Sequence, residues 1–178
     1  MFERDGFVDA RIVDIAAEAG VATGSFYTHF DGKKAAFAAV IAELTEETLH
    51  PRVEVTHRSE DPVAGIEAAH REYLETYRRN AKLMALLEQV SLIDEDFRRL
   101  RLERASAFAQ RNAKAIRRLQ QRGLAEPTLD PLLTAHALNA MVSRMANMVF
   151  VHGEQIPFDS LLATLTQLWC GALRIAGR

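Results

Sequence analysis

The sequence contains a single cysteine, Cys170, among its 178 residues. One cysteine cannot form an internal disulfide, so we expect an apolar core to hold the fold in a reducing compartment. No basic segment followed by an apolar run opens the chain, which argues against a secretory signal. The most apolar stretch, residues 138–151, is interrupted by Arg144 and three other polar residues and is too short to span a bilayer. We therefore expect a soluble cytoplasmic protein that does not contact membranes.

The sequence also lacks the local motifs of metal sites and of nucleophilic catalysis. No histidine lies three or four residues from another histidine or from Cys170, which is the spacing that would place two metal ligands on one face of a helix. Glycine-rich phosphate loops and nucleophile elbows are absent. Cys170 has no base near it in the sequence, so we expect an inert, buried thiol. We predict a protein that is not an enzyme and needs no cofactor, with an enzyme whose site is assembled only in three dimensions as an alternative.

Positive charge is scarce where a nucleic-acid partner would need it. The net charge is −2, and the first 50 residues hold nine acidic residues against four basic ones, Arg4, Arg11, Lys33 and Lys34. Phosphate binding depends on local Lys and Arg rather than on the sum. The charge balance weakens the case for DNA binding without excluding it.

Helical periodicity is present along nearly the whole chain. Apolar residues recur three and four positions apart, and no segment alternates with a period of two. Asp61-Pro62 and Asp130-Pro131 each place an N-cap acceptor before a proline, and Gly123 is a stop signal. We predict an all-α fold with helices over residues 12–19, 23–30, 33–50, 61–80, 82–92, 94–122, 130–152 and 159–176.

Two domains are expected. Residues 1–45 would form a helix-turn-helix DNA-binding domain, and residues 46–178 a larger helical domain for ligand binding and dimerisation. The helix over residues 33–50, which His50-Pro51 would close, is the expected connector between them.

The stretch AGVATGSFYTHF, residues 19–30, predicts the helix-turn-helix. The helix before it carries an apolar stripe formed by Ile12, Ile15, Ala16 and Ala19. Gly20 permits a sharp turn, and we expect Val21 to fill the angle between the two helices. A glycine turn of this length favours a DNA-reading pair of helices.

The second helix of the pair would bury Phe26 and Phe30 on one face. At about 100° per residue, the opposite face carries small polar residues, flanked by hydrogen-bonding groups. The outward residues are Gly24, Ser25 and Thr28, and the flanking residues are Tyr27 and His29. Small side chains allow a helix axis to approach base edges, while the flanking groups reach phosphates. The alternative is an ordinary exposed face on which Tyr27 only packs.

Here the chain resembles the tetracycline-repressor (TetR) family of one-component bacterial regulators. The resemblance covers MFERDGF and VDIAAEAGVATGSFYTHFDGKKAAF, and it is carried by Ile15-Ala16, Gly20-Val21, Gly24, Tyr27, Phe30 and Lys33. It implies that Tyr27, His29 and Lys33 hold DNA phosphates. It also implies that Thr23, Gly24, Ser25 and Thr28 lie in the major groove. Arg11, at the start of its helix, is expected to reach a further phosphate.

Three departures from the family pattern carry expectations of their own. The family has a longer first helix, so we expect residues of that helix to be missing before Met1. Ala10 stands where a Ser or Thr cap is common, so Asp9 is expected to cap instead. Ala22 replaces a usual serine, which leaves Thr23 as the expected N-cap of the helix over residues 23–30.

The segment 94–122 has two contrasting faces. One is an apolar stripe in which Asn112 is the polar exception. The other carries Arg98, Arg99, Arg101, Arg104, Arg111, Arg117 and Arg118. We predict that these arginines are solvated, with a second nucleic-acid surface as the less favoured reading.

The last two helices have more apolar surface than one bundle can bury. The helix over 130–152 has a methionine-rich face and a small-residue face that includes Ala146, and the helix over 159–176 shows a similar surplus. We predict a homodimer through these two helices, which the resemblance also implies.

Methionines and aromatics recur on faces that point into the bundle. We predict a ligand cavity lined by Tyr73, Tyr77, Met84, Phe108, Met141 and Met145, with Asn112 as a polar anchor. Plain core packing is the alternative for each of them. The resulting hypothesis is a repressor that a small, mainly apolar effector releases from double-stranded operator DNA. An all-helical adaptor that has lost DNA binding is the second reading.

Overall fold

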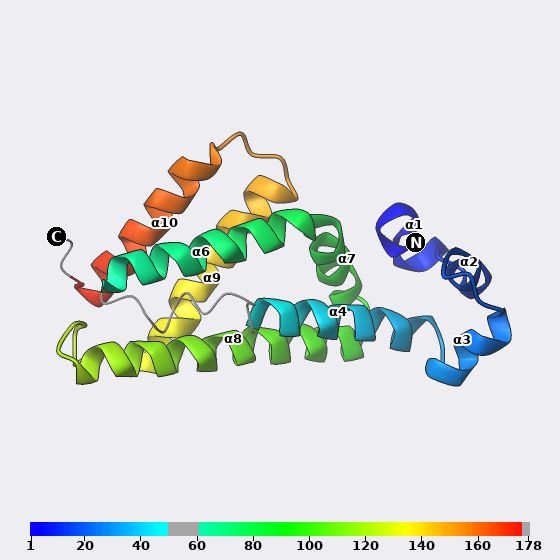
Figure 1. Cartoon of the computed structure of the whole chain (residues 1–178), viewed down its shortest axis with the longest axis horizontal. Helices are drawn as coiled ribbons and strands as arrows, with labels where there is room; N and C mark the ends of the chain where they lie inside the picture. Colours follow the sequence, from blue (N-terminus) through cyan, green and yellow to red (C-terminus); the bar gives the residue numbers. More distant parts are fainter. Residues whose placement is uncertain (50–60, 176–178) are drawn as a thin grey trace. The chain divides into compact units, whose positions relative to one another are not determined.

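The computed structural model describes residues 1–49 and 61–175. Within these residues the regular structure is all helical, which confirms the predicted fold class (Figure 1). The helices are α1 Phe2–Asp9, α2 Ile12–Glu18, α3 Thr23–His29, α4 Lys33–Leu49, α6 Pro62–Arg79, α7 Ala81–Ser91, α8 Glu95–Gln121, α9 Pro131–Phe150 and α10 Phe158–Leu173. The predicted closing pair His50-Pro51 lies outside the described residues.

The predicted start and stop signals are confirmed where the sequence marked them. Asp61 accepts a hydrogen bond from the Val63 backbone N at 2.9 Å, and Asp130 accepts one from the Leu133 backbone N at 2.7 Å. Gly123 has a φ of +69°, the left-handed conformation expected after a helix end. Local sequence therefore sets where α6 and α9 begin and where α8 ends.

The chain divides into two compact units. The N-terminal unit comprises Met1–Glu47 and Lys82–Leu102, and the bundle unit comprises Thr48–Ala81 and Glu103–Arg178. The division predicted from the sequence was a single cut near residue 45. In space, α7 and the start of α8 group with the N-terminal helices, so α8 contributes residues to both units.

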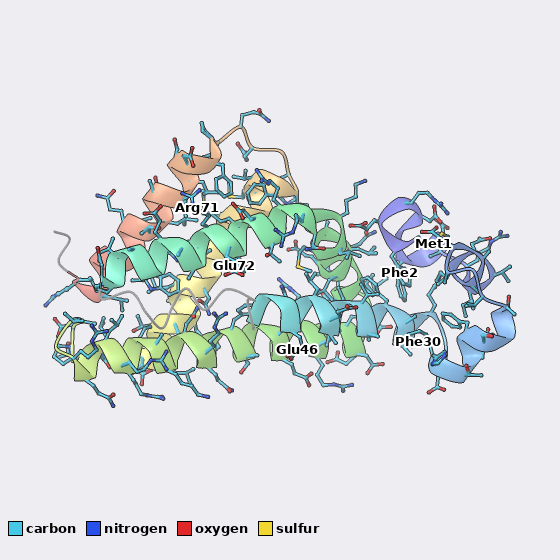
Figure 2. All side chains as sticks on the ribbon, in the orientation of Figure 1. Met1, Phe2, Phe30, Glu46, Arg71 and Glu72 are labelled. Carbon is cyan, nitrogen blue, oxygen red and sulfur yellow. The ribbon has the colours of Figure 1, made fainter. Side chains whose placement is uncertain are left out.

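The core of the N-terminal unit is a cluster of phenylalanines. Phe2 is labelled in Figure 2, and its ring lies 5.0 Å from that of Phe37. The Phe7 and Phe97 rings lie 5.5 and 5.3 Å from that of Phe37. Phe37 and Phe97 are buried. The cluster joins α1, α4 and the first turn of α8 around one aromatic centre, and so holds the short helices in place.

The bundle unit is built on α6, which packs along α10 and against α9 (Figure 1). Its buried residues include Leu74 of α6, Ile116 of α8 and Leu165 of α10. On α9, Ala135 and Ala146 are fully buried. The small-residue face of α9, which the sequence offered as one possible dimer surface, therefore packs within the chain.

No helix in the described parts of the chain combines the length and the apolar character that a membrane crossing would need.

Candidate functional site

The turn between α2 and α3 has the geometry that its glycine predicts. Gly20 has a φ of +70°, and the Val21 backbone N donates to the Ala16 carbonyl at 3.0 Å. Ala16 and Phe26 are buried between the two packed helices. Val21 is 46% exposed, so the expectation that it fills the angle is wrong. Ala16 and Phe26 already fill the space between α2 and α3, so Val21 remains exposed.

The predicted outward face of α3 is exposed. Gly24, Ser25, Thr28 and His29 are exposed, and Tyr27 is 56% exposed. The Tyr27 ring stands edge-on to the buried Phe26 ring, with 5.6 Å between the ring centres. This contact fixes the Tyr27 ring and leaves its hydroxyl on the exposed side of α3. The Thr28 hydroxyl donates to the Ser25 carbonyl at 2.6 Å. Thr23 is half-buried at the start of the helix.

Neither predicted helix cap forms. Ala22 occupies the N-cap position of α3, and Thr23 is the first helical residue. Arg11 is the N-cap residue of α2, and Asp9 ends α1 instead. Neither helix has a side-chain hydrogen bond to its first turn. No side chain of the described residues therefore satisfies the first backbone N–H groups of α3.

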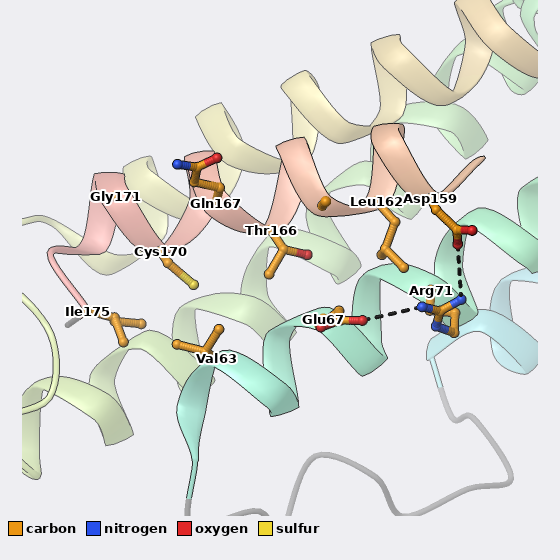
Figure 3. Close-up of a pocket in the computed structure, with 11 residues that line it drawn as sticks. Val63, Glu67, Arg71, Asp159, Leu162, Thr166, Gln167, Cys170, Gly171 and Ile175 are labelled. Carbon is orange, nitrogen blue, oxygen red and sulfur yellow. Dashed lines mark hydrogen bonds and ion pairs between the residues drawn. The ribbon is translucent and has the colours of Figure 1, made fainter. Parts of the chain in front are cut away.

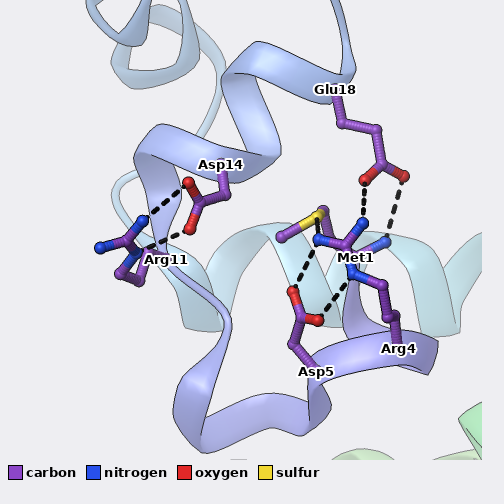
Figure 4. Close-up of polar contacts among 6 residues, drawn as sticks. All are labelled: Met1, Arg4, Asp5, Arg11, Asp14 and Glu18. Atoms are coloured by element: carbon purple, nitrogen blue, oxygen red, sulfur yellow. Dashed lines mark hydrogen bonds and ion pairs between the residues drawn. The ribbon is translucent and has the colours of Figure 1, made fainter.

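The cations near α3 are held by partners within the chain. Arg11 forms two hydrogen bonds with Asp14, at 2.6 and 3.0 Å (Figure 4). This pairing raises the pKa of Arg11 and lowers that of Asp14. The Lys33 ammonium donates to the Val8 carbonyl at 2.6 Å and lies 5.1 Å from the centre of the Phe7 ring.

A second ion pair lies beside the first. Arg4 pairs with Asp5 at 2.7 Å and with Glu18 at 3.5 Å (Figure 4). The hydrogen bond from Arg4 lowers the pKa of Asp5. Acidic side chains thus pair with both arginines of this region.

In the bundle unit, three predicted ligand residues come together. The Tyr73 ring lies 5.9 Å from that of Tyr77 and 6.2 Å, edge-on, from that of Phe108. The cluster extends to Phe150, whose ring lies 6.3 Å from that of Tyr77. The aromatic cluster therefore joins α6, α8 and α9.

Polar groups accompany these rings. Asn112 donates to the Asn139 side-chain oxygen at 2.7 Å, which links α8 to α9. Burial raises the pKa of Tyr73. Asn147 donates to the Tyr77 hydroxyl at 3.5 Å. The sequence identified Asn112 but gave no sign that Asn139 and Asn147 would face the same bundle.

The three predicted methionines are placed differently. Met141 and Met145 are half-buried on α9 in the bundle unit. Met84 is buried on α7, in the N-terminal unit. The structure does not group Met84 with the other predicted ligand residues.

Arg104 is a correction to the predicted solvated face of α8. Its guanidinium carbon lies 5.2 Å from the centre of the Phe108 ring, and its Nε is buried without a hydrogen-bond partner in the described structure. Arg111 is also half-buried, and burial lowers the pKa of both arginines. The remaining five are exposed as predicted, namely Arg98, Arg99, Arg101, Arg117 and Arg118.

A groove of about 660 Å³, which the sequence did not indicate, lies between α6 and α10 (Figure 3). Arg71 reaches Glu67 at 3.3 Å and Asp159 at 3.8 Å at one end, and Cys170 lines the other end. Burial raises the pKa of the Cys170 thiol, which suits the inert, buried role expected for it. Among the described residues, no cluster of His, Cys, Asp and Glu could hold a metal ion.

An exposed reading helix after a glycine turn, followed by a separate helical bundle, defines a helix-turn-helix regulator. Residues 1–40 match the family model for bacterial regulatory proteins of the tetR family, and residues 66–174 match that for the C-terminal domain of the transcriptional regulator EthR. The chain therefore belongs to the TetR family of transcriptional regulators.

Solved structures share the fold at low sequence identity. A TetR-family regulator from Rhodococcus sp. is 18% identical, with a TM-score of 0.81 over 97% of this chain and 92% of its own. The fatty acid degradation regulator FadR from Bacillus halodurans is 17% identical, with a TM-score of 0.81 over 98% and 91%. FadR from Bacillus subtilis, solved with stearoyl-CoA, is 14% identical, with a TM-score of 0.81 over 96% and 92%. No curated protein sequence matches the chain.

Family membership settles the class of function. TetR-family regulators bind operator DNA through the N-terminal domain and small-molecule effectors through the C-terminal domain, and they form dimers. The chain is accordingly a ligand-responsive, DNA-binding transcriptional regulator and not an enzyme. The adaptor reading is not favoured.

Proposed function

We propose that the protein is a repressor that reads a near-palindromic operator through the exposed face of α3. The observation that carries this proposal is the placement of Gly24, Ser25 and Thr28 on that face, directly after the glycine turn. Thr23, Gly24, Ser25 and Thr28 would approach base edges, because their small side chains let the helix axis enter the major groove. In a dimer, two such helices would lie about 34–36 Å apart and face successive grooves.

Phosphate contacts would come from the edges of the same surface. Tyr27 and His29 flank the outward face of α3, and Arg11 is exposed at the start of α2. Lys33 would contribute a fourth contact by exchanging the Val8 carbonyl for a phosphate. Arg11 and Lys33 already have partners within the chain, which are Asp14 and the Val8 carbonyl. Each phosphate contact would cost the residue its internal partner, and this loss would reduce the net gain in binding free energy.

The proposed dimer interface is the exposed side of α9 and α10. On α10, Leu168 is 51% exposed, and Ala172, one helical turn further along, is also exposed. On α9, Ala137 and Ala140 are exposed. Small residues beside a large apolar one allow a second pair of helices to approach closely.

The proposed effector site lies in the bundle unit around Tyr73, Tyr77 and Phe108, with Asn112 as a polar neighbour. Met141 and Met145 on α9 would supply adaptable apolar surface. The stearoyl-CoA held by the FadR structure from Bacillus subtilis supports an effector with a long apolar chain. We therefore propose a mainly apolar effector.

The test measures DNA binding and effector binding on the same protein. An operator is first selected from random duplexes, and its affinity is then measured by fluorescence anisotropy with and without fatty-acyl compounds. By linkage, an effector that releases DNA must bind the operator complex more weakly by the same factor, usually about 5–150-fold. Failure to select any duplex sequence would refute the DNA-reading role. Equal effector affinity with and without operator would refute the release mechanism.

A further inference from the structure

Among the described residues of the bundle unit, Arg104 has no carboxylate partner. Its Nε is buried and makes no hydrogen bond, and no acidic side chain of the described residues forms an ion pair with it. The exposed arginines Arg98 and Arg99 on the same helix, in contrast, pair with Glu95 at 3.0 Å and with Asp96 at 2.8 Å. Arg104 as a whole is half-buried, and its guanidinium stays protonated. A charge that is partly removed from water is stabilised by a paired counter-charge.

The surroundings of Arg104 are the residues proposed to line the effector site. Its guanidinium lies over the Phe108 ring at 5.2 Å, and Phe108 stands edge-on to Tyr73 at 6.2 Å. The face of the Phe108 ring attracts the Arg104 guanidinium, but this cation–π interaction is weaker than an ion pair with an anion.

We propose that Arg104 pairs with an anionic group at one end of the effector, so that the effector is a chain-like amphiphile rather than a wholly apolar molecule. The guanidinium fork suits a carboxylate or a phosphate, because either group can accept two of its N–H bonds. The apolar chain of the effector would lie against Phe108 of α8 and against Met141 and Met145 of α9. This inference rests on the proposed function, because it assigns chemistry to the effector of the same site.

The experiment compares three probes that share one apolar chain: decanoate, methyl decanoate and decanoyl-CoA. Methyl decanoate keeps the chain and removes the charge, while the other two place the anion in a carboxylate or in phosphates. We expect wild-type protein to bind at least one anionic probe about tenfold or more tighter than the ester. Which anionic probe is preferred identifies the source of the charge.

The variants separate pairing from packing. Arg104→Met should abolish the preference for the anionic probe while changing affinity for methyl decanoate less than about twofold. Arg104→Lys should retain part of the preference, because it keeps the charge but loses the fork. Arg117→Met, on the exposed part of α8, is the matched control and should leave the preference unchanged.

Stability without effector provides a second readout. Because Arg104 forms no ion pair with any of the described residues, Arg104→Met should melt at the same temperature as wild type or higher. A much lower melting temperature would overturn the inference by showing that Arg104 stabilises the fold.

The outcomes distinguish this inference from the proposed function. If methyl decanoate binds as tightly as the anionic probes and still releases DNA, the proposed function stands and the role of Arg104 is refuted. A preference for the anion that survives in Arg104→Met refutes it as well. If none of the three probes binds or releases DNA, both the inference and the proposed effector class are refuted.

Discussion

Arg11 and Asp14 lie one helical turn apart and form two hydrogen bonds, from Nε to Oδ2 at 2.6 Å and from Nη2 to Oδ1 at 3.0 Å. The cation closest to the start of α2 is therefore already paired before DNA arrives. In the proposed DNA complex, a phosphate would compete with Asp14 for Arg11, so Asp14 would lower the affinity for DNA.

Removal of that competitor should strengthen DNA binding. Asp14→Asn is expected to raise operator affinity about two- to tenfold and to steepen the salt dependence by about one unit of slope, because Arg11 can then release a counterion from DNA. Anisotropy titrations at several salt concentrations measure both quantities. Glu43→Gln, on the exposed side of α4, removes the same charge elsewhere and is the control. Equal effects from the two variants would mean that only net charge matters.

Tyr27 and Thr28 should affect binding in different ways. Tyr27→Phe keeps the ring beside Phe26 and removes the hydroxyl, so it should weaken binding to all operators alike, by about 1 kcal/mol. Thr28→Ala should change which bases are preferred, because its side chain faces the groove in the proposed complex. Binding to a panel of single-base operator variants separates the two. A change of base preference in Tyr27→Phe would contradict the phosphate role.

The missing cap of α3 offers a test of stability. Ala22→Ser should supply the absent hydrogen bond to the first turn and raise the free energy of unfolding by about 1 kcal/mol. Urea denaturation followed by circular dichroism measures the change. Ala42→Ser, at an exposed position inside α4, adds the same hydroxyl without capping a helix and should destabilise slightly. If both variants lose stability, the α3 start is capped by another route.

His70 should make stability depend on pH. Burial lowers its pKa to about 4, while the unfolded chain keeps an ordinary histidine pKa of about 6.5. Between these values the unfolded state binds more protons, so stability is full above pH 6.5 and falls toward pH 4, by at most about 1.4 kcal/mol per pH unit.

The comparison uses His70→Gln, which stays neutral and can keep a hydrogen bond to Thr166, now 3.1 Å from the ring nitrogen. Its unfolding free energy should fall less than that of wild type between pH 7 and pH 5. His136→Gln, at an exposed site on α9, should follow the wild-type curve. Identical pH dependence in wild type and His70→Gln would show that His70 does not titrate in this way.

The dimer proposal predicts opposite results for two substitutions on the last two helices. Leu168→Glu places a charge on the exposed side of α10 and should give folded monomers in analytical ultracentrifugation. Ala146→Arg, at a fully buried position, should instead unfold the bundle unit, which circular dichroism detects. Leu92→Glu, at an exposed site in the N-terminal unit, is the control. An unaltered dimer for Leu168→Glu would move the interface elsewhere.

The sequence by itself determined where the helices begin and end and that α2 and α3 form a helix-turn-helix. Helix periodicity and capping depend on residues a few positions apart, so the Asp61 and Asp130 starts, the Gly123 stop and the Gly20 turn could be predicted locally. The orientation of α3 followed in the same way, because burying Phe26 leaves Thr28 on the opposite side of the helix.

The tertiary structure alone decided which helical faces meet. Arg104 belongs to an arginine-rich face of α8, but it lies over the Phe108 ring, which in turn packs against Tyr73 of α6. Ala146 belongs to a small-residue face that could serve a partner subunit equally well, and only the packing of α9 within the chain assigns it to the core. Val21 is exposed because Ala16 and Phe26 already close the angle. These outcomes depend on contacts between residues far apart in the sequence. The apolar period of one helix shows which of its faces is buried, but it does not show which other helix covers that face.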